Sequence, residues 1–141
     1  MTQRQLSELV RHQNPLTLPP TASVQEACRK MAERRVGAVL VTGKDHQLMG
    51  IFTGRDAVAR VLAEGLDPAK TKLADVMTKN PTTASPGCKA VECLRLMQDC
   101  GFRHVPIVDG GKLSGVVSRG DFRGYEQDRL DEETGLWERI A

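Results

Sequence analysis

Two short polar motifs in this chain combine residue types and a spacing that suit the binding of a nucleotide. Gly50-Ile-Phe-Thr-Gly-Arg-Asp56 recurs as Gly115-Val-Val-Ser-Arg-Gly-Asp121, so each copy places a hydroxyl three residues before a carboxylate. An ionised carboxylate only accepts hydrogen bonds and can take two neighbouring ribose hydroxyls. The Thr53 or Ser118 hydroxyl and nearby main-chain N–H groups can face a phosphate. Two such sites in one small domain favour a nucleotide sensor over an enzyme.

The same motifs also have a purely structural interpretation. A Thr or Ser three residues before an acidic residue is the pattern of a helix capping box, and the aspartate favours the positive end of a helix. Taken alone, either motif is more often a cap than a ligand site. We favour ligand binding because the motif occurs twice and follows a glycine and two apolar residues, which a cap does not require.

The duplication extends along most of the chain. At a shift of 66 residues, matching pairs include Asn14-Pro15 with Asn80-Pro81, Thr17 with Thr83, and Pro20 with Pro86. A helical apolar pattern also repeats, as Val24, Ala27, Cys28 and Met31 and then as Ala90, Cys93, Leu94 and Met97. A two-fold repeat predicts two units that each bury an incomplete core and complete it against one another.

Composition narrows the possible classes of protein. The 141 residues fit one compact domain with an aliphatic core, since only 4% are aromatic. No apolar run is long enough to span a bilayer, and the N-terminus has no signal-peptide pattern, so we expect a cytoplasmic protein without membrane contact. The net charge of +2, with its basic surplus in residues 1–121, suits a small anion. Without a dense basic stripe, we do not expect nucleic acid as a partner.

The four cysteines do not indicate a metal site. Cys28, Cys88, Cys93 and Cys100 form no Cys-x-x-Cys pair, and their spacing toward His104 matches no common zinc pattern. We therefore expect no metal. Cys28 and Cys93 are expected to pack as small apolar side chains in a reducing compartment.

The motifs must be positioned by short strands and helices. The first copy predicts a short helix at 6–12, a short strand at 16–18, a helix at 24–35, strands at 36–41 and 48–52, and a helix at 56–63. The second predicts an opening segment at 73–77, a helix at 89–100, strands at 104–108 and 113–117, and a helix from Asp121. Each unit is strand–helix–strand–strand–helix, an α+β architecture. The apolar stripe Val58, Val61 and Leu62 on the helix at 56–63 predicts a homodimer.

This order of elements resembles the CBS domain, present here as the tandem pair called a Bateman module, over about residues 6–128. Besides the two motifs, Leu73-Ala-Asp-Val-Met-Thr78 with Pro81 and Arg103-His-Val-Pro-Ile-Val-Asp109 are typical of the family. The tail that ends near Trp137 resembles the C-termini of small stand-alone bacterial CBS proteins. The expected division of this one compact module is repeat 1 at 1–65, a linker at 66–72, repeat 2 at 73–128 and a tail at 129–141.

The resemblance implies two CBS repeats packed with pseudo-two-fold symmetry and a non-catalytic regulatory role. It implies adenosine nucleotides (AMP, ADP or ATP) bound in clefts between the repeats, with no cofactor used as a catalyst. Carried over to this sequence, it assigns Asp56 and Asp121 to the ribose. It places near ribose or phosphate Thr53, Ser118, Arg55, Arg119, Arg103 and His104. It places around the adenine Thr17, Thr83, Ile51, Val116, Val105 and Pro106.

Several alternatives stay open at this point. His104 is either a partly buried neutral histidine or a phosphate contact. The ligand could instead be S-adenosylmethionine or NAD(H), and the module could be a structural dimerisation module with vestigial clefts. The sequence contains no catalytic triad or phosphate loop of an enzyme, and no catalytic domain accompanies the two copies. We therefore expect any regulated activity on a protein partner of unknown identity.

Overall fold

The computed structural model describes residues 4–11 and 13–122 and divides the chain into two compact units. The Asp56 unit comprises Asn14–Pro81 with Gly110–Leu113. The Asp121 unit joins the chain's opening residues, up to Gln13, to Thr82–Asp109 and to the segment that starts at Ser114. Each unit therefore combines one motif with an opening segment that belongs, in sequence, to the other repeat.

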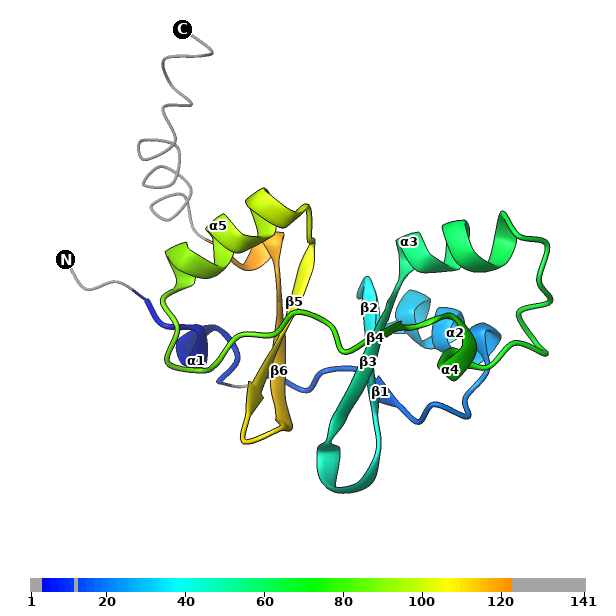
Figure 1. Ribbon diagram of the computed structural model, residues 1–141, viewed down its shortest axis with the longest axis horizontal. Coiled ribbons are helices and arrows are strands. Elements are labelled where there is room, and N and C mark those ends of the chain that lie inside the picture. Colours follow the sequence, from blue (N-terminus) through cyan, green and yellow to red (C-terminus); the bar gives the residue numbers. More distant parts are fainter. Residues whose placement is uncertain (1–3, 12, 123–141) are drawn as a thin grey trace, which may run out of the picture. The chain divides into compact units, whose positions relative to one another are not determined.

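The Asp56 unit contains a four-stranded sheet in the order β1-β2-β3-β4 (Figure 1). Its strands are β1 (Thr17–Leu18), β2 (Ala38–Thr42), β3 (Leu48–Thr53) and β4 (Thr78–Lys79). β1 runs parallel to β2, whereas the β2–β3 and β3–β4 pairs are antiparallel. The register aligns one row across all four strands, namely Thr17, Leu40, Ile51 and Thr78.

Helices cover one side of this sheet. α2 (Val24–Arg34) begins at Ser23, whose hydroxyl accepts from the Glu26 N–H at 3.1 Å, and ends at Arg35 in a left-handed conformation. α3 (Gly54–Asp56) continues into the wider helical turn η2 (Ala57–Leu62) (Figure 1). α4 (Leu73–Val76) follows, and the 3₁₀ turn η1 (Lys44–His46) lies between β2 and β3.

One residue of the predicted apolar stripe differs from the expectation. Val61 is fully buried in the core of the Asp56 unit, together with Phe52 and Met31. Val58 and Leu62 are 60% and 63% exposed. The geometry of η2 explains the difference, because this segment is a wider π-helix, in which residues four apart lie closer to one side than residues three apart. The exposed stripe thus consists of Val58 and Leu62 without Val61.

The Asp121 unit is built on two paired strands, β5 (His104–Asp109) and β6 (Lys112–Ser118). They are joined by a tight turn through Gly110 and Gly111, both of which have positive φ. α5 (Ala90–Cys100) ends at Gly101, which also has positive φ. After β6 the chain makes the 3₁₀ turn η3 (Arg119–Asp121), and Phe122 is extended. The helix predicted from Asp121 therefore does not begin there, and residues 123–141, with Trp137, lie outside the described residues.

The chain's opening segment is bound into the Asp121 unit by main-chain hydrogen bonds. α1 (Leu6–Leu9) starts where Leu6 N donates to Cys88 O at 2.8 Å, and Ser7 N donates to Pro86 O at 2.9 Å. The side chain of Leu6 is fully buried in this unit's core, against residues such as Met97 and Ile107. The opening segment therefore completes the second core.

The Asp56 unit repeats the same arrangement with the opening segment of the second copy. Leu73 N donates to Ala22 O at 2.9 Å, and Ala74 N donates to Pro20 O at 3.0 Å. Leu73 is fully buried in the core of the Asp56 unit. The two copies thus exchange opening segments, and the mixed α+β fold is confirmed. Within the described residues, no helix has both the length and the apolar character needed to cross a membrane.

Candidate functional site

The first motif forms a reciprocal capping box at the end of β3. Thr53 N donates to Asp56 Oδ2 at 3.0 Å, and Asp56 N donates to Thr53 Oγ1 at 3.2 Å. These bonds satisfy main-chain donors at the start of α3, which the helix cannot satisfy itself. They also fix the Asp56 carboxylate at the point where the strand turns into the helix.

The second motif holds its aspartate in a similar way. Ser118 N donates to Asp121 Oδ2 at 2.7 Å, and Ser118 Oγ lies 3.3 Å from the same oxygen. Each carboxylate is thus engaged locally through Oδ2. A carboxylate offers about four lone-pair positions over its two oxygens, so this engagement leaves capacity for further donors. The capping role is therefore real and is compatible with a second role in binding.

Arg60, which the sequence analysis did not assign to a site, contacts Asp56. Arg60 Nε lies 3.8 Å from Asp56 Oδ1, and its Nη1 donates to Val76 O at 3.1 Å and to Met77 O at 3.3 Å. One arginine therefore connects the first motif to the exchanged segment that carries α4. The four-residue spacing from Asp56 to Arg60 in the sequence indicates this contact, because residues four apart on a helix are neighbours.

Three residues predicted for the first site share one face of the sheet in the Asp56 unit. Thr17 and Ile51 both lie in the row that crosses the four strands. Thr53 is two residues beyond Ile51 on β3, so strand alternation places it on the same face. Arg55 follows in α3 and is exposed. The structure therefore brings together Thr17, Ile51, Thr53 and Asp56 in one unit.

The predicted residues of the second site fall into two groups. Val105, Ile107 and Val117 point into the core of the Asp121 unit. Alternation therefore places Pro106 and Val116 on the opposite face, together with His104 and Ser118. Val105 was predicted to lie around the adenine. Its side chain is instead fully buried in the core of the Asp121 unit. Thr83 is exposed and immediately precedes Ala84, which bridges to Ile107.

Basic residues gather at the end of β6. Arg119 N donates to Arg103 O at 3.2 Å, which holds the main chains of these two exposed arginines side by side. Burial lowers the pKa of His104; the Asp121 carboxylate opposes this shift, and the positive charge of Arg103 adds to it. The neutral, partly buried histidine is thus the form that this environment favours at neutral pH.

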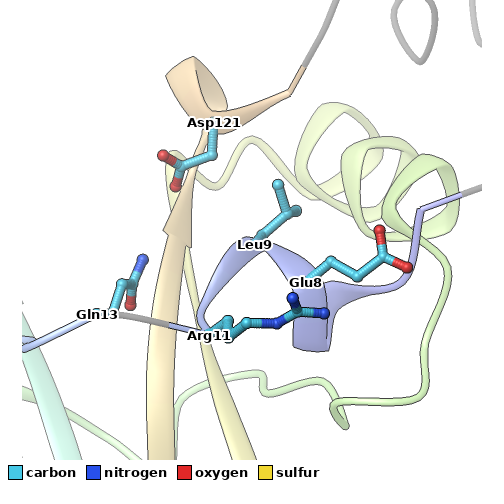
Figure 2. A pocket seen from close by; sticks show the side chains of 5 residues that line it. All are labelled: Glu8, Leu9, Arg11, Gln13 and Asp121. Carbon is cyan, nitrogen blue, oxygen red and sulfur yellow. The ribbon is translucent and has the colours of Figure 1, made fainter.

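A cavity of about 540 Å³ lies beside Asp121, within the same unit. It is lined by Glu8, Leu9, Arg11, Gln13 and Asp121 (Figure 2). Four of these residues come from the opening segment, and none of those four was predicted from the sequence as a site residue. The feature of the sequence that indicates this packing is Gly115, the glycine that opens the second motif.

Glycine at position 115 permits the opening segment to lie directly against β6. A Cβ atom there would be 2.7 Å from Val10 Cβ and 2.7 Å from Gln13 Oε1. Gly50 plays the same part in the Asp56 unit, where a Cβ atom would be 2.8 Å from Thr78 O. The glycine of each motif therefore marks close approach of an exchanged segment.

Comparison with known proteins agrees with this geometry. A model of the CBS domain matches residues 6–63 and again residues 73–128, which together make up most of the chain. This chain belongs to the CBS-domain family. Its two CBS domains each carry one of the hydroxyl–carboxylate motifs.

Individual CBS proteins are similar over most of this chain. A CBS domain-containing protein of Arabidopsis thaliana, CBSCBSPB3, is 42% identical over 102 residues, covering 72% of this chain. This chain spans only 18% of that relative's length. Among solved structures, the CBS domain protein PAE2072 from Pyrobaculum aerophilum, complexed with AMP, has a TM-score of 0.81 and 27% identity. That match covers 92% of this chain and 99% of the other.

A signal-transduction protein with CBS domains from Burkholderia ambifaria gives a comparable match. Its TM-score is 0.77 at 30% identity, with 84% of this chain and 90% of that chain covered. The likeness therefore extends over both CBS domains.

Proposed function

We propose that this chain is a non-catalytic regulatory module that binds an adenosine nucleotide (AMP, ADP or ATP) at its CBS motifs. The observation that carries the proposal is the placement of each aspartate, which the main chain of Thr53 or Ser118 fixes at the end of a strand. An acceptor-only group held in this position suits a pair of ribose hydroxyls. The similar CBS protein complexed with AMP supports the choice of nucleotide.

In this proposal the neighbouring residues complete each site. Thr53 and Ser118 approach the ribose or phosphate, as do Arg55 near Asp56 and Arg103, His104 and Arg119 near Asp121. Thr17 and Ile51 contact the adenine of the Asp56 site, and Thr83, Pro106 and Val116 contact the adenine of the Asp121 site. Val105 supports the second site from the core, since its side chain is buried.

Nucleotide binding would act on a partner through a change of conformation. A ligand shifts an equilibrium only by as much as it binds one state better than the other. A regulated protein on another chain would then recognise the nucleotide-bound state.

Calorimetry with AMP and 2′-deoxy-AMP tests the role of the aspartates. A hydrogen bond to a charged group contributes about 1.5–3 kcal/mol, so the deoxy form should bind at least roughly ten times more weakly. A thermal-shift panel of AMP, ADP, ATP, NADH and S-adenosylmethionine identifies which ligand stabilises the native state. Equal affinities for AMP and its 2′-deoxy form would remove the ribose role.

Single and double variants separate the two sites. Asp56→Ala and Asp121→Ala each remove a cap as well as a ribose acceptor, so a stability loss of about 0.5–2 kcal/mol is expected in both. Each should also abolish or weaken one binding event. Asp99→Ala, at an exposed position near the end of α5, is the matched control and should bind like the parent. If the folded double variant binds AMP like the parent, the motifs are only caps.

We also propose that the chain forms a homodimer, which is the basis of the competing structural role. Val58 and Leu62 are exposed on one helix, and Leu66 beyond it is 42% exposed. Exposed apolar clusters of this kind favour association. Light scattering should give twice the 15.5 kDa of one chain. Val58→Glu with Leu62→Glu should give the monomer mass, whereas Glu64→Ala should not change it. A monomeric parent at micromolar concentration contradicts the dimer.

A further inference from the structure

The cavity beside Asp121 combines side chains from both copies of the sequence. Asp121 comes from the second motif, and Glu8, Leu9, Arg11 and Gln13 come from the segment that opens the first repeat (Figure 2). Its volume of about 540 Å³ is in the usual range for a small-molecule site, about 300–1,000 Å³.

Two residues of the lining offer the kinds of group that a nucleoside phosphate can use, namely an acceptor and a cationic donor. Asp121 is a hydrogen-bond acceptor, whereas Arg11 presents a guanidinium with five donors and no acceptor. Ribose hydroxyls donate to a carboxylate, and a phosphate accepts from a guanidinium, commonly through two bonds at once. Arg11 is exposed, so its guanidinium can reach a ligand at the mouth of the cavity.

The opening segment is held in place on both sides of Arg11. Arg4 Nη2 donates to the main-chain oxygen of Asp121 at 3.3 Å, which connects the segment to the turn η3. Gln13 binds the main chain of Val116 on β6 through both ends of its amide. The anchors at Arg4 and Gln13 therefore hold the segment that carries Arg11 in the Asp121 unit.

The Asp56 unit lacks a counterpart of Arg11. The shift of 67 residues that relates Leu6 to Leu73 matches Arg11 with Thr78. Thr78 is uncharged and pairs with Ile51 as part of β4. The two copies thus differ in charge at this matched position of the sequence, where Arg11 lies in a turn and Thr78 lies in β4.

We propose that Arg11 is a phosphate-binding residue of the Asp121 site, so that this site selects phosphorylated nucleotides and the Asp56 site lacks this contact. The inference rests on the proposed function, because the ribose role of Asp121 belongs to it. Glu8 lines the same cavity and opposes a phosphate electrostatically. Its carboxylate therefore weakens phosphate binding, and removing its charge strengthens that binding.

Calorimetry with AMP and adenosine in the Asp56→Ala background, where the ribose acceptor of the first site is absent, measures binding at the Asp121 site. This background also loses the cap on Thr53 N, so each further variant is compared with the background and not with the parent. Arg11→Ala should weaken AMP roughly tenfold or more, as expected for one charge-assisted hydrogen bond, and change adenosine by less than about twofold. Arg11→Lys should lie between Arg11→Ala and the background, because an ammonium keeps the charge without the bidentate geometry.

Two further variants serve as checks. Arg29→Ala removes an exposed arginine from α2 of the Asp56 unit and should leave both ligands unchanged. Glu8→Gln should tighten AMP and leave adenosine unchanged, because only AMP carries the charge that Glu8 opposes.

The outcomes separate this inference from the proposed function. If Arg11→Ala binds AMP as the background does, Arg11 has no phosphate role, although the proposed function stands. If Arg11→Ala weakens adenosine as much as AMP, Arg11 acts through structure and the inference also fails. If the parent binds none of AMP, ADP, ATP and adenosine, the proposed function itself fails and takes the inference with it.

Discussion

The side chain of Gln13 binds the main chain of Val116 at both of its hydrogen-bonding groups. Gln13 Nε2 donates to Val116 O at 2.6 Å, and Val116 N donates to Gln13 Oε1 at 2.9 Å. In the other unit the corresponding strand, β3, pairs with the main chain of β4 instead. One amide side chain thus replaces a short strand along β6 and holds the opening segment beside Asp121.

We predict that Gln13→Ala destabilises the protein by about 1–3 kcal/mol, because it leaves two partly buried main-chain groups of Val116 without their partners. Urea unfolding measures the change. Gln25→Ala, on the exposed surface of α2, is the control and should stay within about 0.5 kcal/mol of the parent. Equal midpoints for the two variants would show that the amide contact contributes nothing to stability.

Gly115→Ala should destabilise the Asp121 unit by about 1–3 kcal/mol, because the added methyl overlaps Val10 and Gln13 in a closely packed place. The matched change Gly54→Ala adds a methyl where no atom lies within 4 Å, at the start of α3. It should be neutral or slightly stabilising, since alanine favours helix. Thermal unfolding compares them, and a Gly115→Ala melting temperature at or above that of Gly54→Ala contradicts the prediction.

The stability of the protein should fall in mildly acidic solution because of His104. Burial lowers the pKa of this histidine in the folded state, so the unfolded state binds the proton more readily. The full stability is present above the unfolded pKa of about 6.5 and is lost as the pH falls below it and through the folded pKa.

Urea midpoints between pH 8 and pH 5 measure this dependence. His104→Gln should show a smaller fall than the parent, because it removes the titrating group. His46→Asn, in the exposed turn η1, should follow the parent. Identical pH profiles for the parent and His104→Gln would show that another group causes any acid destabilisation.

The cysteines should react with Ellman's reagent in an order set by burial. Burial raises the pKa of Cys93 to about 12, with a contribution from the nearby Cys88, and its side chain is almost fully covered. Cys100 is exposed, so it should supply the fast phase at pH 8, and Cys100→Ser should lose that phase. Cys93 should react only after unfolding. Rapid labelling of Cys93 in the native protein would contradict the packing around it.

Local signals in the sequence were sufficient for the order and type of most elements. α2 begins at Val24 as predicted, after the cap at Ser23, and Gly101 ends α5 with the positive φ that favours glycine. β2 begins at Ala38, two residues later than predicted, because Arg35 takes a left-handed conformation and Val36 stays exposed. Capping and periodicity act over a few residues, so they are visible in the sequence itself. The predicted boundaries of the linker and tail stay predictions.

The composition of each candidate site depended on contacts between distant parts of the chain. Gln13 and Val116 are 103 residues apart, and no local pattern indicates that an amide will pair with that strand. Likewise, the sequence does not show which face of β5 packs into the core, and that packing decides where the side chain of Val105 points. The sequence alone determined the repeated motif and the family to which it belongs. Only the tertiary structure decided that each aspartate is accompanied by the other repeat's opening segment. The physical reason is that Leu6 is buried in the core of the Asp121 unit and Leu73 in the core of the Asp56 unit.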